Sequence, residues 1–262
     1  MTNRIMMALI CLTASLQFLY SQTNNANKHK TLAWSYLNGV SFDVRAGINI
    51  GGSTPIPLPK EIRSLDSYSP GLAITIEGYA TKWINPNKDF GISIGLRLDN
   101  KDMKAKSTVK NYNMAIINVD KKMEGLWTGG VQTRAKMSLL SLPVLGVYEV
   151  NDRWKVYAGP YFSYLINGDF EGNVYDGHLR TPDAAGSIVS FEGDNVAEYN
   201  FSNELRKFQW GAQLGGEWKA YKHLTLHADL TWGLNDIFNK DFKTISFSMY
   251  PIYLNIGFGY AF

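Results

Sequence analysis

Apolar and polar residues alternate with a period of two along most of the chain after residue 40, and this alternation predicts β-strands with two unlike faces. In the last segment, 250–262, every even position carries a large apolar residue and most odd positions are small or polar. Seven earlier segments alternate in the same sense: 42–50, 72–80, 90–98, 140–150, 154–164, 208–218 and 224–234. The least regular is 140–150, because Leu145 and Val147 fall on its otherwise polar side. We therefore expect eight strands.

The length of these segments distinguishes them from ordinary sheet strands. They are about 9–13 residues long, whereas a strand that crosses a membrane needs about 9–11 and a typical sheet strand has about 5–6. Long two-faced strands favour a closed barrel, because closure leaves no unpaired edge. The pattern predicts an all-β fold, an eight-stranded antiparallel β-barrel.

Two kinds of barrel fit an alternating pattern, since a soluble lipocalin-like barrel lines its interior with the apolar face and a membrane barrel turns that face to lipid. Three features favour lipid. The polar face is rich in Gly, Ser, Thr and Ala, which fit the narrow interior of eight strands. Short turns at 85–89, 151–153 and 220–223 alternate with long connections at 51–70, 99–138, 167–207 and 236–247.

The third feature is the position of aromatic residues at the two ends of the apolar face, where membrane barrels carry aromatic girdles. One end carries Phe42, Phe90, Tyr148, Trp154, Trp218, Tyr260 and Phe262, and the other carries Tyr164, Phe208, Trp210, Trp232 and Tyr250. We expect a transmembrane barrel in a bacterial outer membrane, with both termini on the periplasmic side.

The first 21 residues have the pattern of a cleaved signal peptide. Arg4 precedes an apolar stretch, 5–16, and the segment ends at the small residue Ser21. The alternative is a short N-terminal anchor helix. The predicted organisation is a signal peptide at 1–21, a polar periplasmic leader at 22–39 and the barrel at 40–262. The single cysteine, Cys11, lies in the signal, so the mature chain has none.

Composition narrows the class of protein. Of the 262 residues, 45% are hydrophobic and 19% are charged, and the latter is below the usual value of about 25%. This composition excludes a disordered chain. The net charge of +3 is small and scattered, so we expect no nucleic-acid partner.

Several short stretches resemble the PorT-type outer-membrane β-barrel family. They are Ser141–Tyr148 (SLPVLGVY), Trp154–Tyr161 (WKVYAGPY), Lys207–Gly211 (KFQWG), Leu230–Asn235 (LTWGLN) and the ending GFGYAF at Phe262. The resemblance covers about residues 40–262 and implies the barrel fold and the outer-membrane location. Some members of that family are associated with protein secretion, and the family has no active site to carry over. Phe262 resembles the C-terminal aromatic signal that outer-membrane assembly machinery reads.

Charged residues fall on the face that a membrane barrel encloses. They are Asp43, Arg45, Glu77, Arg97, Glu149, Lys155, Glu217 and Asp229, accompanied by His227 and Asn255. Unpaired charge in a confined interior is costly, so we expect a mixed network of ion pairs that fills the lumen. The alternative is a narrow ion path or a proton relay.

The sequence offers no convincing catalytic or metal-binding set. His223 and His227 are four residues apart on a strand, about 13 Å, which is too far for one ion. Asp176, His178 and Asp183 could suggest a hydrolase at the barrel rim, but the nucleophile pattern G-x-S-x-G is missing. We expect no enzyme, no metal and no cofactor.

The segment 99–125 is rich in lysine and is expected to form a solvated hairpin that extends the third and fourth strands. Its lysines are Lys101, Lys104, Lys106, Lys110, Lys121 and Lys122. They could contact anionic membrane lipid.

The leading function is a non-enzymatic structural or binding protein with a filled lumen, whose external loops contact ligands or envelope proteins. The alternatives are a narrow pore for transport and an accessory part of protein secretion.

Overall fold

The computed structural model describes residues 39–262, apart from 86, 88, 119–120 and 194–195. The predicted signal peptide and the leader up to residue 38 lie outside the described residues. Within the described part of the chain, no helix is long and apolar enough to cross a bilayer.

Strands make up nearly all of the region from Ser41 to Phe262. They are β1 (Val40–Pro55), β2 (Ile62–Pro70), β3 (Ile74–Trp83), β4 (Phe90–Asn118), β5 (Lys121–Asn151), β6 (Trp154–Thr181), β7 (Ser187–Phe191), β8 (Ala197–Asn200), β9 (Phe208–Tyr221), β10 (Leu224–Gly233) and β11 (Met249–Ala261). A 3-10 turn, η2 (Ser202–Glu204), precedes β9.

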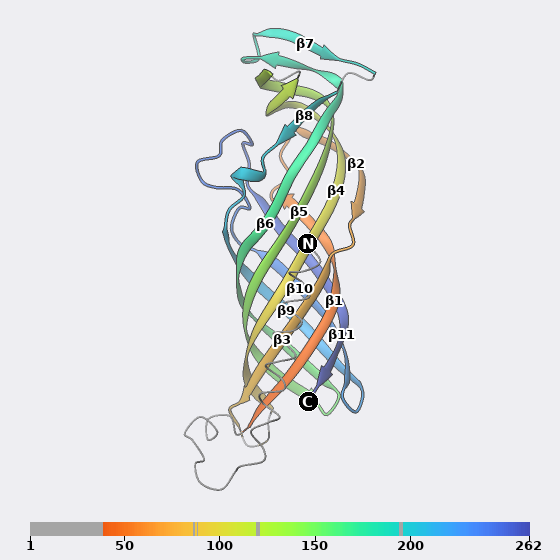
Figure 1. The fold of residues 1–262 in the computed structure, drawn as a ribbon, viewed down its shortest axis with the longest axis vertical. Coiled ribbons are helices and arrows are strands. Elements are labelled where there is room, and N and C mark those ends of the chain that lie inside the picture. The colour runs from red at the N-terminus through yellow and green to blue at the C-terminus, as the bar shows by residue number, and fades with distance from the viewer. Residues whose placement is uncertain (1–38, 86, 88, 119–120, 194–195) are drawn as a thin grey trace, which may run out of the picture. The chain divides into compact units, whose positions relative to one another are not determined.

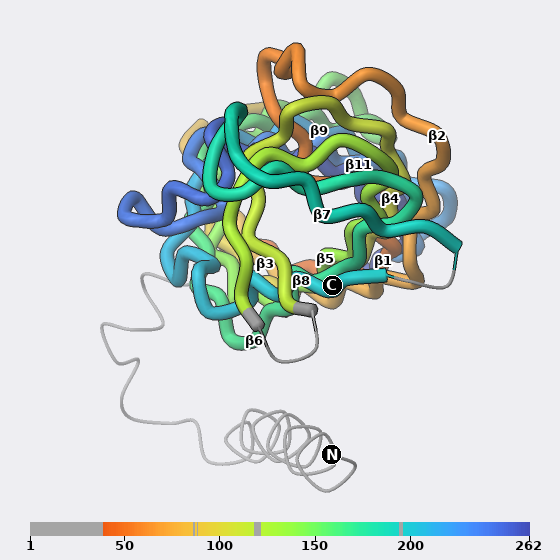
Figure 2. Tube along the Cα trace, turned by 90° about the horizontal axis from the view of Figure 1, so that it is seen from above, coloured from red at the N-terminus to blue at the C-terminus, as the bar shows by residue number. Residues whose placement is uncertain are grey.

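Eight of these strands close into a ring (Figures 1 and 2). Going round it, β1 pairs with β11, and then β10, β9, β6, β5, β4 and β3 follow until β3 meets β1 again. Neighbouring strands run antiparallel, so that Asp229 lies opposite Asn255 and Leu230 opposite Leu254. The predicted eight-stranded antiparallel barrel is confirmed.

The two faces of the ring are divided as the alternation requires. Outward-facing Ile94, Leu230 and Leu254 are 53%, 43% and 38% exposed, whereas inward-facing Arg97 and Asp229 are 1% and 0% exposed. An apolar exterior around a polar interior is stable only where the exterior meets hydrocarbon. The interpretation of the apolar face as the lipid-facing one is therefore confirmed.

Aromatic side chains gather at both ends of the lipid-facing band. At the end with the short turns, the rings of Trp154 and Trp218 stack with centroids 6.1 Å apart. At the other end, Phe162 and Phe208 stack at 6.3 Å. Each pair joins neighbouring strands of the ring, β6 and β9. Amphipathic and aromatic rings at these levels suit the two membrane interfaces.

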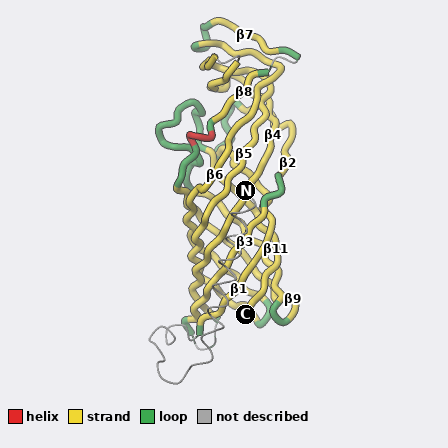
Figure 3. The backbone as a smooth tube through the Cα atoms, viewed as in Figure 1, coloured by secondary structure: helices red, strands yellow, loops and turns green. Residues whose placement is uncertain are grey.

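The long connections are not loops as expected, because β4, β5 and β6 continue far beyond the band as strands of 29, 31 and 28 residues. We call this part the extension; it consists of 52–70, 99–138, 165–205 and 236–249 (Figure 3). There β2 pairs with β4, and β7 and β8 pair with β6. The predicted lysine-rich hairpin is present, but only one of its faces is solvated.

The inner face of the extension explains why these strands continue. Met103 and Val109 on β4, and Val131 and Met137 on β5, keep the alternation and are buried in an apolar core. Lysines and other polar residues occupy the outward positions between them, so the segment as a whole has the composition of a polar loop although its inward positions are apolar. Burial of this core favours paired strands over a solvated loop.

Candidate functional site

The barrel encloses a polar network at the level of the lipid-facing band. At the end with the short turns, Arg45 Nε lies 3.0 Å from Asp43 Oδ2 and Arg45 Nη2 lies 2.9 Å from Glu217 Oε2. Lys155 Nζ lies 3.2 Å from the other oxygen of Glu217. Glu149 is half-buried at the same opening and makes no ion pair with the residues that the structure describes.

A second group of charges lies deeper and is centred on Arg97. Its guanidinium is 3.8 Å from Glu77 and 3.6 Å from Asp99, and it donates a hydrogen bond of 3.2 Å to Gln213. Asp99 is also 3.7 Å from Lys101 Nζ. The sequence placed Lys101 among solvated lysines, and this was wrong. Its odd position turns it inward, where it is 2% exposed.

Tyrosines connect the two groups. The guanidinium of Arg45 lies over the ring of Tyr79 at 4.7 Å and donates a hydrogen bond of 2.8 Å to the hydroxyl of Tyr157. Tyr79 in turn donates to Glu77 at 3.0 Å. A guanidinium between aromatic faces is stabilised by the ring quadrupoles. Sequence reasoning missed these tyrosines, although they occupy odd-numbered positions, as the inward charged residues do.

Glycines on neighbouring strands make room for these rings. A side chain at Gly95 would place its Cβ 2.4 Å from Tyr79, and one at Gly215 would place it 2.5 Å from Tyr157. Real Cβ atoms do not approach so closely. The small residues of the inner face therefore accommodate large inward side chains, which is how eight strands fill their interior.

A chain of amides fixes the hydrogen-bond pattern around His227. Asn49 Nδ2 donates to Asp99 at 2.6 Å, and Asn255 Nδ2 donates to Asn49 Oδ1 at 2.8 Å. The Oδ1 atom of Asn255 faces His227 Nε2 at 2.9 Å. Because a carboxylate only accepts, each amide in the chain is oriented, and Nε2 of His227 must carry the donated proton.

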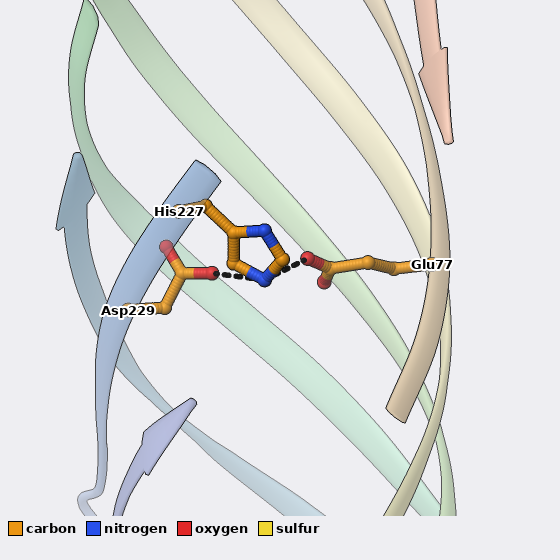
Figure 4. A group of neighbouring side chains, drawn as sticks. All are labelled: Glu77, His227 and Asp229. Carbon is orange, nitrogen blue, oxygen red and sulfur yellow. Dashed lines mark ion pairs between the residues drawn. The ribbon is translucent and has the colours of Figure 1, made fainter. Parts of the chain in front are cut away.

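One group of three side chains has the composition of a metal site (Figure 4). Glu77, His227 and Asp229 offer ligand atoms that all lie within 4.8 Å of one another. His227 Nε2 is 3.8 Å from Glu77 Oε1 and 4.0 Å from Asp229 Oδ2. Sequence reasoning considered pairs of histidines only and missed this set. The inward motif His227-x-Asp229 was its one visible signal.

The hydrogen-bond pattern around His227 and the neighbouring guanidinium oppose a divalent cation in this group. Nε2 already carries a hydrogen directed to Asn255, and a metal needs the nitrogen lone pair. Arg97 already supplies positive charge 3.8 Å from Glu77.

Beyond the polar network the interior becomes apolar. Lys101 lies over the ring of Tyr253 at 4.9 Å, and the next inward side chains include Met103, Met137 and Leu165. All three are at most 4% exposed. A desolvated apolar layer is a barrier to ions. Charged groups therefore lie at one level of the barrel interior, and an apolar layer lies beyond them.

The residues that suggested a hydrolase do not form a site. Asp183 accepts a hydrogen bond from the backbone of Ala185 in a turn after β6. Asp176 lies within β6 and has a positive φ of 46°. Neither Asp176 nor His178 makes an ion pair within the described part of the chain.

Comparison with protein families supports the same architecture. A family model described as an outer membrane protein beta-barrel domain matches residues 20–239. The chain belongs to this family. Membership implies a protein of the bacterial outer membrane. A comparison with curated proteins found no match.

Several solved structures are similar to this chain. The attachment invasion locus protein Ail of Yersinia pestis, solved with the heparin analogue sucrose octasulfate, is 11% identical over 85% of this chain and 97% of its own, with a TM-score of 0.34. The outer membrane protein OprG of Pseudomonas aeruginosa is 16% identical over 85% and 95%, with a TM-score of 0.32. The outer membrane protease OmpT of Escherichia coli is 10% identical over 86% and 94%, with a TM-score of 0.31.

Proposed function

We propose that this chain is a non-enzymatic outer-membrane protein whose barrel is sealed and whose extension serves as a binding module. The observation that carries the proposal is the interior. Buried charges such as Arg45, Arg97 and Glu217 are paired, and the apolar layer at Met137 and Leu165 follows them along the axis. Both features oppose a continuous water path along the barrel axis.

The orientation in the membrane is part of the proposal. The short turns, β3–β4, β5–β6 and β9–β10, lie at one end of the ring, together with Phe262. Short turns belong to the periplasmic side of outer-membrane barrels. The termini are then periplasmic, and the extension faces the outside of the cell.

Planar-bilayer recording tests the sealed barrel. The purified full-length protein should give no stepwise conductance, since ions would have to displace paired charges and cross an apolar layer. Bilayers that receive detergent without protein are the control. Reproducible conductance steps that depend on the protein would contradict the proposal and favour the alternative, a narrow pore.

A proton path is the second candidate, and one observation favours it. The hydrogen-bonded chain Asp99–Asn49–Asn255–His227 runs along the inner wall of the barrel, over β4, β1, β11 and β10. Liposomes that contain the protein and a trapped pH indicator would reveal proton flux. Acidification that is lost in Asn255→Leu would support a relay, and acidification equal to that of empty liposomes would exclude it.

Partners follow from position and resemblance. We propose contacts with outer-membrane lipid through the apolar band, and with the assembly machinery through Phe262, which is 70% exposed. The resemblance to the PorT-type family keeps a role in protein secretion, with envelope or secretion proteins as neighbours, within the proposal. Cross-linking in intact membranes followed by purification would identify these neighbours, and consistent recovery of secretion components would support that role.

A further inference from the structure

The extension contains an apolar cavity that is separate from the polar lumen. It lies between the end of β1, strand β2, the inner faces of β4 and β5, and the segment from Ile245 to the first residue of β11, and its volume is about 180 Å³. Val131, Phe170 and Phe247 contribute to its wall. On β4 the outward residues beyond Leu98 include Asn100 and Lys104, so the cavity lies beyond the lipid-facing band.

The cavity has the size of a ligand site for a small molecule. A dry apolar cavity on the order of 150 Å³ binds benzene or xenon. A volume of about 180 Å³ therefore has room for a compound of one or two rings. An apolar cavity of this size costs stability when it stays empty, so occupation by a fitting molecule would be favourable.

The wall of the cavity disfavours a charged ligand. The hydroxyl of Tyr199 accepts a hydrogen bond of 2.6 Å from Thr133 and donates one of 3.0 Å to the carbonyl of Gln132, so it has no hydrogen left for a ligand. Burial raises the pKa of Tyr199 and of Tyr112, so both rings stay neutral at physiological pH. No described side chain on the wall carries a charge. A charged ligand would lose its hydration without gaining a partner.

Flexible and aromatic side chains suit a flat guest. Three methionines, Met103, Met114 and Met249, line the cavity, and thioethers adapt their shape and contact aromatic rings favourably. Tyr112 and Phe247 meet edge to face at 5.6 Å on the same wall. This combination favours an aromatic molecule over a branched aliphatic one.

The entrance lies beside β2. Leu58 and Leu65 line the cavity and are nevertheless 66% and 64% exposed, outside the lipid-facing band. Strand β2 pairs only with β4 among the described strands, and its register shifts twice, between Ile62 and Ser64 and between Leu65 and Ser67. An irregular strand held on one side can move at low cost, which opens a way in from water.

We infer that the extension binds a small uncharged aromatic molecule in this cavity and admits it beside β2. The inference deepens the proposed function, because it names the class of ligand that the binding module takes. It does not depend on whether the barrel conducts ions.

Fluorine NMR of the full-length protein in lipid nanodiscs tests the inference, with 5-fluoroindole as the probe and indole as competitor. The probe should show a resonance that is absent from protein-free nanodiscs and that indole removes. Ala105 lines the cavity, and Ala105→Leu should weaken binding at least about tenfold by filling it. The matched control is Ala212→Leu, an exposed alanine of the lipid-facing band, which should bind as the wild type does.

A second variant covers the case in which Ala105→Leu does not fold. Leu65→Asn changes an exposed side chain at the entrance and should weaken binding about fivefold. Absence of the protein-dependent resonance in the wild type would overturn the inference, as would equal binding by the wild type and every folded cavity variant. Either result would leave the sealed barrel untouched, because conductance is recorded without the probe.

Discussion

Buried charge is the feature of individual residues that most constrains this protein. Parity along the strands was enough to predict that Glu77, Arg97 and Asp229 point inward, and the structure places all three there. The odd or even position of a residue gives the face of the strand on which it lies, but not which side chains it contacts across the lumen. Glu77 lies on β3 and His227 on β10, and these strands are not neighbours in the ring. Their contact depends on strand order and on position along the axis, which no short-range pattern encodes.

Arg97 should be the residue whose loss costs the most stability. It is 1% exposed and lies near Glu77 and Asp99, so Arg97→Ala would leave buried Glu77 without its guanidinium partner and Asp99 with Lys101 as its one cation in the described part of the chain. We expect the free energy of unfolding to fall by about 3–5 kcal/mol, measured by reversible urea unfolding in detergent.

The control for this prediction is a solvated ion pair of the extension. Lys122 Nζ lies 2.7 Å from Glu124, and both side chains are well exposed. Lys122→Ala should change the free energy of unfolding by no more than about 1 kcal/mol. Equal effects of the two substitutions would show that the interior is as well hydrated as the surface.

The group Glu77, His227 and Asp229 should not bind zinc strongly. The proton on Nε2 and the nearby guanidinium of Arg97 both oppose a divalent cation. We expect added Zn²⁺ to leave the melting temperature unchanged. A zinc-dependent rise that disappears in Glu77→Gln would contradict this and establish a metal site.

At the scale of secondary-structure elements, the sequence predicted the eight membrane strands well and the extension poorly. Alternation in the membrane strands is regular because most inward positions are polar or small and most outward positions are apolar, with Leu145 and Val147 of β5 as inward apolar exceptions. In β4 the outward positions become lysine while the inward ones become apolar, as at Lys104 and Met103. In the extension the inward face is apolar and the outward face polar, which is the opposite of the membrane strands. A search for the membrane-strand pattern alone therefore predicts a loop there.

Strand β2 should loosen at low pH. Ser64 donates a hydrogen bond of 2.6 Å to Asp66, and Thr108 of β4 donates one of 2.8 Å. These bonds hold the pKa of Asp66 below its ordinary value. A lowered pKa means that the stabilisation is present above the pKa of the unfolded chain and is lost as pH falls through that of the folded one.

Hydrogen exchange measures this loosening. Protection factors of the β2 amides should stay constant above about pH 5 and fall as the pH drops below about 4, while those of β10 stay constant throughout. Asp66→Asn should lack this pH dependence, because its amide does not titrate. An unchanged pH profile in that variant would refute the role of Asp66.

At the scale of the whole molecule, one closed ring separates three environments. An apolar band covers the outside of the ring, buried polar and charged side chains line its interior, and an apolar core with its cavity occupies the extension. The sequence predicted the ring, because long two-faced strands need closure. It could not predict the cavity, which depends on how residues from β1, β2, β5 and the segment before β11 come together.

The central claim is that the apolar face of the strands contacts lipid and the polar face is enclosed. Spin labels attached one at a time to cysteines in a Cys11→Ser background test it directly, by collision with oxygen in lipid bilayers. Labels at Ile94, Leu230 and Leu254 should collide freely with lipid-dissolved oxygen, and labels at Ser93 and Thr231 should be shielded. High oxygen accessibility at Ser93 and Thr231, with shielding at Leu230 and Leu254, would contradict the account.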